Sequence, residues 1–161
     1  NSKLYRGGIG MAGEFGHIRI SGLEAPCHCG KIGCLETVSS GRAIEKVAGK
    51  PLQEIIEAAR KDDISAIDLL HRAGEKLGEG IATMVHLFNP DMVVIGGEIV
   101  QAGDLMLVPV QQAINKYALA RMRGHCELKM SNLGVYSAIL GTLMMVMEHL
   151  YDDTECEYSL Y

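Results

Sequence analysis

One stretch, residues 13–36 with the sequence GEFGHIRISGLEAPCHCGKIGCLE, constrains the fold more than any other part of the 161-residue chain. It brings one imidazole and three thiols close enough along the chain to surround a single ion: those of His17, Cys27, Cys29 and Cys34. Three cysteines and one histidine are a donor set that tetrahedral zinc takes in structural sites. The spacing predicts a zinc-binding loop that fixes the chain around it.

Two glycines and a second histidine belong to the same loop. Gly30 and Gly33 adjoin two of the thiols, where a chain that wraps a metal must turn sharply and needs the positive φ that glycine tolerates. His28 is the alternative fourth ligand. It lies between two ligating thiols, which leaves its ring little room to turn inward, so His17 is preferred. The competing interpretation is that the three cysteines are close in sequence by chance and bind no metal. Disulfides between them are not favoured, because no secretory signal is seen.

These motifs resemble the signature of a known family. Gly-Glu-x-Gly-His followed by Cys-x-Cys-Gly-x-x-Gly-Cys-Leu-Glu is similar to the ROK family of bacterial sugar-responsive repressors and sugar kinases. The likeness extends over nearly the whole chain, through residues 89–97 (NPDMVVIGG), the AGDLMLVPV segment, Leu133-Gly134 and Gly141. It implies an α/β fold of the actin-like, ribonuclease H-like ATPase class. Residues 1–161 would form its C-terminal lobe, with a structural zinc loop.

The resemblance also implies a sugar site beside the metal. In the family, residues at the positions of Glu14, His17 and Glu36 contact the hydroxyls of a bound sugar. A carboxylate accepts hydrogen bonds from two hydroxyls, and zinc would take one ring nitrogen of His17 while leaving the other for a ligand. The alternatives are an ordinary surface carboxylate for Glu14, and for Glu36 an acidic residue in the first turn of a helix.

A second candidate site follows the apolar run at residues 92–95. The resemblance places Gly96 and Gly97 beside the nucleotide in the family's kinases, and ligands of open α/β sheets bind at the carboxyl ends of strands. A plain strand-to-helix turn is the alternative. The chain opens with NSKLYRGGIGMAG, which indicates the continuation of a longer protein. The phosphate loop and base aspartate of a family kinase would lie upstream of Asn1, so we expect no catalytic residue here.

Three functions are compatible with these residues. The lobe could sense a sugar in a transcriptional repressor that binds DNA through an upstream helix-turn-helix. It could belong to an ATP-dependent kinase of a hexose or N-acetylhexosamine, or keep zinc without binding a ligand. Many kinases of the family carry small and acidic residues after the late Leu-Gly, whereas LGVYSAILG has Val135 and Tyr136 there. This departure favours the repressor, for which ATP would not be needed.

Composition sets the remaining expectations. A hydrophobic content of 48% is ample for a core, and a net charge of −5 disfavours direct contact of this chain with nucleic acid phosphates. No stretch is long enough to span a membrane and no leader pattern is seen, so a reducing cytoplasm is expected. Gly74 and Gly78 lie one turn apart in a long helical pattern and indicate a closely packed neighbouring helix. The resemblance further implies a homodimer.

Periodicity predicts the order of the elements. Strands are expected at residues 3–5 and 17–20, with His17 at the start of the second, followed by helices at 35–47, ending at Gly49, and at 51–60. A long helix at 65–88 precedes a strand at 92–95 that we expect to be buried on both faces. A helix at 105–122, a strand at 127–130, a helix at 136–150 and a frayed acidic tail complete the order. Cys126 and Cys156 have no ligand pattern.

Overall fold

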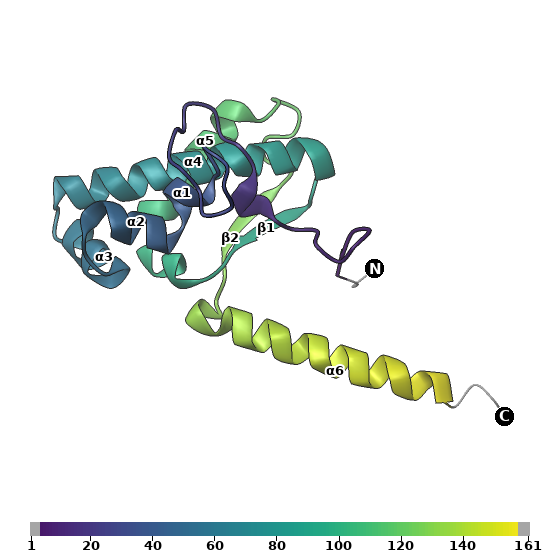
Figure 1. Ribbon diagram of the computed structural model, residues 1–161. Coiled ribbons are helices and arrows are strands. Elements are labelled where there is room, and N and C mark those ends of the chain that lie inside the picture. The colour runs from purple at the N-terminus through teal and green to yellow at the C-terminus, as the bar shows by residue number, and fades with distance from the viewer. Residues whose placement is uncertain (1–3, 158–161) are drawn as a thin grey trace.

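The computed structural model describes residues 4–157, which form helices packed on a small parallel sheet and one helix that projects from the body (Figure 1). The helices are α1 (Glu36–Ser39), α2 (Gly41–Ala48), α3 (Leu52–Arg60), α4 (Ile64–Phe88), α5 (Asp104–Tyr117) and α6 (Ser137–Glu157). The strands are β1 (Met92–Ile95) and β2 (Glu127–Met130), and short 3-10 helices cover Phe15–His17, Glu98–Ala102 and Gly134–Tyr136. Most predicted helices and both later strands are therefore confirmed.

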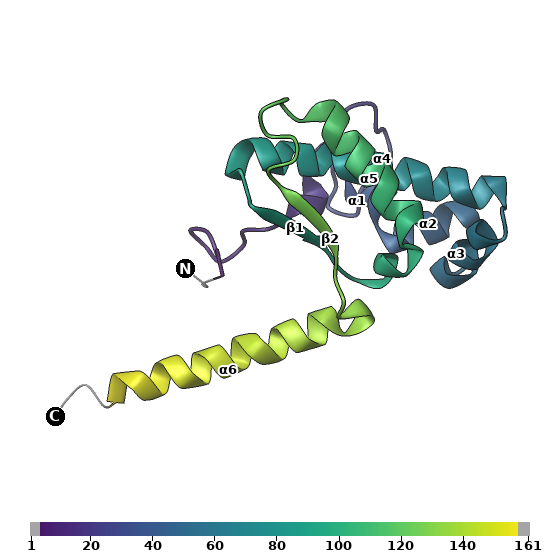
Figure 2. The ribbon, with the colours of Figure 1, turned by 180° about the vertical axis from the view of Figure 1, so that it is seen from behind.

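The long helix α4 is the centre of the lobe. It begins where the Asp63 side chain accepts a hydrogen bond from the Ala66 N–H at 3.0 Å, and it ends at Asn89, which adopts a left-handed conformation. Helix α5 lies along one side of α4, and α1–α3 lie on the other, as the two opposite views show (Figures 1 and 2). Apolar side chains from both sides meet α4 in one core, among them Ile44, Ile56, Leu70, Ile81, Val85, Met106 and Val110.

Two glycines of α4 allow α5 to approach its backbone. A Cβ built on Gly78 would lie 2.4 Å from the carbonyl oxygen of Val110 and 2.6 Å from the Cβ of Ala113. A Cβ on Gly74 would lie 2.7 Å from the ring of Pro109. These distances are shorter than any van der Waals contact, so the predicted close packing at Gly74 and Gly78 is confirmed.

The sheet contains β1 and β2 in parallel, with Met92 opposite Glu127 and Ile95 opposite Met130. Its inner face packs on the core, but on the outer face Met92 and Val94 remain 44% and 55% exposed. The prediction that residues 92–95 are buried on both faces is therefore wrong. Within residues 4–157, β2 is the only strand paired with β1, and no element covers the outer face of the sheet. A run of four apolar residues is therefore not enough to predict that both faces of a strand are buried.

The predicted strands near the N-terminus are also wrong. Phe15–His17 is a 3-10 helix, so His17 ends a helical turn instead of starting a strand. After it, Arg19 pairs with Cys34 in an isolated antiparallel bridge. Leu4 and Tyr5 have no strand pairing among the described residues, and Lys3 lies outside them. A strand forms only where a second segment accepts and donates its backbone hydrogen bonds, and β-rich composition does not supply that segment.

Two helix boundaries differ from the prediction. Ser40 is extended and its hydroxyl accepts from the Ala43 N–H at 3.1 Å, so it separates α1 from α2 within the single helix expected at 35–47. Gly49 caps α2 in the left-handed conformation, as its position after the helical pattern predicts. Helix α5 ends at Tyr117, short of the expected Met122, because Ala118 is extended.

Helix α6 follows the second strand and projects away from the body (Figure 2). Many of its apolar side chains are exposed to solvent. Its exposed large side chains are Ile139, Leu140, Leu143, Met144, Met145, Val146, Met147, Leu150 and Tyr151. The helix continues to Glu157, so the first part of the tail expected to fray is helical, and residues 158–161 lie outside the described chain. No helix in the described part of the chain combines the length and hydropathy of a membrane span.

Candidate functional site

A narrow hairpin shapes the cysteine loop. Pro26 pairs with Ile32 in an antiparallel bridge, and the Cys27 N–H donates to the carbonyl of Lys31 at 2.8 Å. The tip of the hairpin, residues 28–30, closes with a hydrogen bond from the Gly30 N–H to the carbonyl of Cys27 at 3.0 Å. Backbone hydrogen bonds thus form most of the loop, and the Cys29 N–H adds one to Cys27 Sγ at 3.5 Å.

Glycine is required at one position of this hairpin. Gly33 has φ +81°, and a Cβ there would lie 2.5 Å from the carbonyl oxygen of Leu23, an atom that cannot rotate away. Gly30 has a similar φ of +84°, but a Cβ on it would meet nothing within 4 Å. Both glycines therefore adopt the positive φ that the sequence predicts, and Gly33 also allows two backbone segments to come together.

This difference gives a matched pair of variants. Gly33→Ala is expected to lower the zinc affinity of the chain by at least about tenfold, because the clash with Leu23 displaces the neighbouring thiol of Cys34. Gly30→Ala has the same conformational strain without the clash, so a smaller loss is expected. Competition with a chromogenic zinc chelator measures both, and equal losses would show that the close approach at Gly33 does not matter.

The loop rests on α4. Cys34 and Leu35 are each 1% exposed. A Cβ on Gly80 would lie 2.8 Å from Leu35 Cδ2 and 3.1 Å from the ring of Phe15. On the outer side, Lys76 Nζ donates to the carbonyl of Ser21 at 3.3 Å. The metal loop, the 3-10 helix of His17 and the start of α1 are thus all held against one helix.

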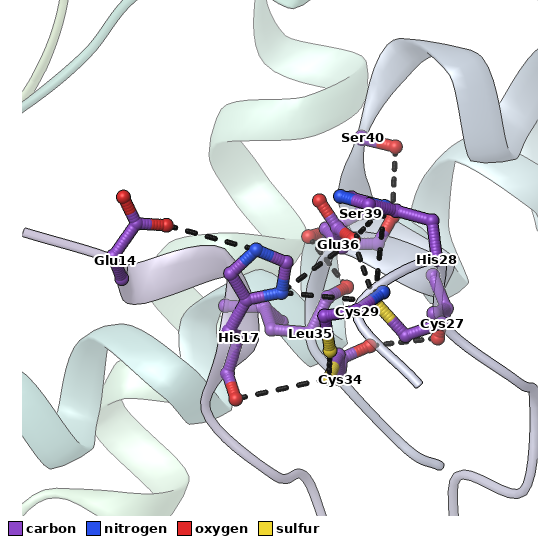
Figure 3. A network of polar contacts seen from close by, with 11 residues as sticks. Glu14, His17, Cys27, His28, Cys29, Cys34, Leu35, Glu36, Ser39 and Ser40 are labelled. Carbon is purple, nitrogen blue, oxygen red and sulfur yellow. Dashed lines mark hydrogen bonds and ion pairs between the residues drawn. The ribbon is translucent and has the colours of Figure 1, made fainter. Parts of the chain in front are cut away.

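The four predicted metal donors meet at one point (Figure 3). His17 Nδ1 lies 3.6 Å from Cys27 Sγ, Cys29 Sγ lies 3.6 Å from Cys34 Sγ, and all four donor atoms fall within 4.8 Å of one another. The edge of a tetrahedral zinc site with Zn–S bonds of about 2.3 Å is about 3.8 Å long. Donor type, number and separation therefore fit a bound metal ion, and the cluster can hold one.

His28 takes a different place. Its Nδ1 lies 2.8 Å from Glu36 Oε1 and 3.9 Å from Cys27 Sγ, and its side chain is 75% exposed. His28, His17 and Glu36 form a second group of potential donors, but this group has three members and shares His17 with the first. The cluster of three cysteines and one histidine is the more complete site. No local sequence pattern predicts the contact between His28 and Glu36, because this contact depends on the hairpin folding over the start of α1.

Burial and hydrogen bonding shift the pKa values around the loop. Burial, assisted by the hydrogen bond that Cys27 donates to Glu36 Oε1 at 2.7 Å, raises the pKa of the Cys27 thiol to about 12. Burial also raises the pKa of Cys34, whereas the backbone N–H of Lys31 lowers that of Cys29. The hydrogen bond from Cys27 lowers the pKa of Glu36. A metal ion must therefore displace the Cys27 proton, and Glu36 is an ionised carboxylate beside it.

The three residues expected to contact a sugar lie around one imidazole. Glu14 Oε2 is 3.6 Å from His17 Nε2, and Glu36 Oε1 is 3.6 Å from His17 Nδ1. Figure 3 shows Glu14 and Glu36 on opposite sides of the ring, from the 3-10 segment and from α1. Because Nδ1 faces the thiols, metal binding there would leave Nε2 directed toward Glu14.

The glycines after β1 line a separate cavity of about 590 Å³. Gly97 has φ +83°, and both Gly96 and Gly97 contribute to the wall together with Ser39 and Ser40 at the end of α1 and Arg42 in the first turn of α2. Glu36 begins α1 and Ser39 ends it, so this short helix links the three-residue cluster of Glu14, His17 and Glu36 to the cavity. The role predicted for the two glycines in nucleotide binding stays a prediction.

Comparison with known proteins places the chain in a family. A model of the ROK family matches residues 1–149. A glucokinase of Halalkalibacterium halodurans is 34% identical over 162 residues, which cover 88% of this chain and 49% of the relative. The DNA-binding transcriptional dual regulator NagC of Escherichia coli is 36% identical over 154 residues, covering 86% of this chain and 38% of the relative. The chain belongs to the ROK family.

The solved structures agree in fold. The crystal structure of a ROK family glucokinase from Streptomyces griseus in complex with glucose and AMPPNP matches with a TM-score of 0.75 at 30% identity, covering 83% of this chain and 51% of that one. The predicted actin-like, ribonuclease H-like α/β class is therefore confirmed. The chain spans about half the length, or less, of these relatives. They include a kinase and a transcriptional regulator at nearly equal identity, so similarity alone does not separate the two functions.

Proposed function

We propose that this chain is the sugar-binding effector lobe of a ROK transcriptional repressor. The observation that carries the proposal is the convergence of Glu14 and Glu36 on the imidazole of His17, whose Nδ1 also lies 3.6 Å from Cys27 Sγ. Two carboxylates accept hydrogen bonds from several hydroxyls of one sugar, and the Nε2–H of a His17 that binds metal through Nδ1 donates one to a sugar oxygen. The glucose complex of the Streptomyces griseus glucokinase supports a sugar as the ligand class.

The metal in this proposal is zinc, held by His17, Cys27, Cys29 and Cys34. With four protein donors such a site has no open position, so the ion would be structural and would hold the loop and the His17 ring in place. Side chains of the protein, and not the ion, would bind the sugar. Glu14 and Glu36 accept hydrogen bonds from the sugar, and His17 presents Nε2 on the same surface.

The choice of a repressor rests on the segment around the third 3-10 helix, Gly134–Tyr136. Tyr136 is 65% exposed at a position where many kinases of the family have a small or acidic residue next to the nucleotide. NagC, at 36% identity, supports a DNA-binding parent. The second candidate is the corresponding lobe of an ATP-dependent sugar kinase. It is supported by the Halalkalibacterium halodurans glucokinase and by the cavity at Gly96 and Gly97.

The parent protein is proposed to carry a further lobe upstream of residue 1. The apolar surface of α6 and the exposed outer face at Met92 and Val94 support this, because parallel sheets are normally covered on both faces. The upstream half would add the helix-turn-helix of a repressor, or the phosphate loop and base aspartate of a kinase. A homodimer in the cytoplasm remains our prediction for the whole protein.

Sugar binding by the parent protein tests the function. Isothermal titration with glucose, N-acetylglucosamine and xylose is expected to identify one ligand. Glu36→Gln is expected to weaken its binding by about ten- to a hundredfold, because a charged acceptor of hydroxyl hydrogen bonds is lost at constant size. Glu57→Gln, on the exposed surface of α3, is the matched control and should leave the affinity unchanged.

The same preparation separates the alternatives. Mixed with ATP and the bound sugar, a repressor should release no ADP, whereas steady sugar-dependent release would establish the kinase. If none of the sugars binds while zinc is present, the lobe has kept its metal without the sugar site, and the proposed function is wrong.

A further inference from the structure

The cysteine loop brings two thiols into contact with each other. Cys29 Sγ and Cys34 Sγ lie 3.6 Å apart, and the cysteines whose side chains are described are all free. We propose that these two thiols form a reversible disulfide when the loop holds no metal, which makes the loop a site of redox modification by peroxides. Oxidation and metal binding would then exclude each other. The mutual exclusion of oxidation and metal binding rests on the proposed metal site, whereas formation of the disulfide does not depend on it.

The two thiols differ in access. Cys29 is exposed at the tip of the hairpin, whereas Cys34 is 1% exposed beneath it. A peroxide can therefore reach Cys29 first. The Cys29 sulfur attacks the O–O bond, forms a sulfenic acid and releases water from hydrogen peroxide. The Cys34 sulfur then attacks the Cys29 sulfur and a second water leaves. Two thiols and one hydrogen peroxide thus give one disulfide and two waters.

The third thiol of the loop, that of Cys27, lies within 4.8 Å of the other two sulfurs but is hydrogen bonded to a carboxylate. Cys27 Sγ donates to Glu36 Oε1 at 2.7 Å and lies 3.6 Å from His17 Nδ1. A disulfide requires the sulfurs of Cys29 and Cys34 to close from 3.6 Å to about 2.05 Å. Gly30 and Gly33 lie between them, so the backbone can adjust while the bridge between Pro26 and Ile32 keeps the hairpin together. The geometry selects the pair Cys29–Cys34 over the two pairs that include Cys27.

The disulfide would remove two of the four metal donors. The sulfurs of a disulfide carry no thiolate, and the remaining pair, His17 and Cys27, cannot complete a four-coordinate site. A bound metal would in turn hold both sulfurs away from each other and from the oxidant. The disulfide therefore prevents metal binding, and a bound metal prevents formation of the disulfide.

The test uses the whole chain, in which Cys126→Ser and Cys156→Ser leave only the three loop thiols of the five cysteines. Metal-free protein treated with hydrogen peroxide should lose two thiols and the mass of two hydrogen atoms. Peptide mapping should join Cys29 to Cys34. Zinc-loaded protein should react about tenfold more slowly, and reduction with a phosphine should restore zinc uptake.

Two results would overturn the proposal. The first is that native protein forms all three possible loop disulfides in the same proportions as protein oxidised in denaturant. The second is that the thiols are oxidised stepwise to sulfinic acid and no disulfide forms. Equal rates with and without zinc would refute the exclusion alone. Cys27→Ser should still form the disulfide and Cys29→Ser should not, so the assignment is tested even if Cys34 variants do not fold.

Discussion

Cys34→Ser is expected to abolish stoichiometric zinc binding and to lower the Tm of the chain by roughly 5–10 °C. The thiol is 1% exposed, contacts Cys29 Sγ and lies 3.7 Å from the carbonyl oxygen of His17. A hydroxyl there is a poor zinc ligand, so three donors remain. A metal present at a hundred times its dissociation constant stabilises the folded state by about 2.7 kcal/mol, and this contribution would be lost.

Metal analysis and thermal unfolding with and without a chelator measure this effect. Wild-type protein should contain about one zinc ion per chain and lose the same stability on chelation, whereas Cys34→Ser should not respond to the chelator. Cys126→Ser controls for the loss of a thiol, because Cys126 lies beside β2, away from the loop. A Cys34→Ser protein that still binds one zinc ion with unchanged affinity would disprove the assignment of the ligand.

Gly78→Ala is expected to lower the free energy of unfolding by about 2–4 kcal/mol. The added methyl would lie 2.4 Å from the carbonyl oxygen of Val110 and 2.6 Å from the Cβ of Ala113, so α4 and α5 must separate. Alanine favours the helix by about 1 kcal/mol over glycine, which offsets only part of this cost. Urea unfolding followed by circular dichroism gives the difference.

Gly141→Ala on α6 is the matched control. A Cβ there meets nothing within 4 Å, so the substitution should leave stability unchanged or raise it slightly. If Gly78→Ala proved as stable as wild type, the close packing of α4 on α5 would not be essential to the core.

The features that were predictable from sequence are those set by local chemistry. Helix α4 follows from its apolar period and from Pro90, which disfavours helical geometry in the residue before it. The meeting of His17, Cys27, Cys29 and Cys34 in one cluster follows from residue type and spacing alone. The glycine pair of α4 was predictable as a packing site because glycine lowers helix stability unless close contact compensates.

The errors arose where structure depends on distant segments. Burial of β1 on one face, and the absence of strands before the cysteine loop, are set by which elements are available to pair with them. The helix expected at 35–47 places Ser40 in its interior, although the Ser40 hydroxyl can cap the next helix. The contact of His28 with Glu36 depends on how a hairpin folds onto a helix, which no local pattern records.

The glycines along α4 also determine its mechanical behaviour. Leu35 and Phe15 lie against the backbone at Gly80, and α5 does the same at Gly74 and Gly78. Two packed helices usually accommodate small displacements because the side chains between them change rotamer. At these glycines no side chain of α4 separates its backbone from the neighbouring residues. A shift of the 3-10 helix that bears His17 would therefore move α4 and α5 together. Strain imposed at the cluster of Glu14, His17 and Glu36 would then be passed through α4 to β1, the next element along the chain.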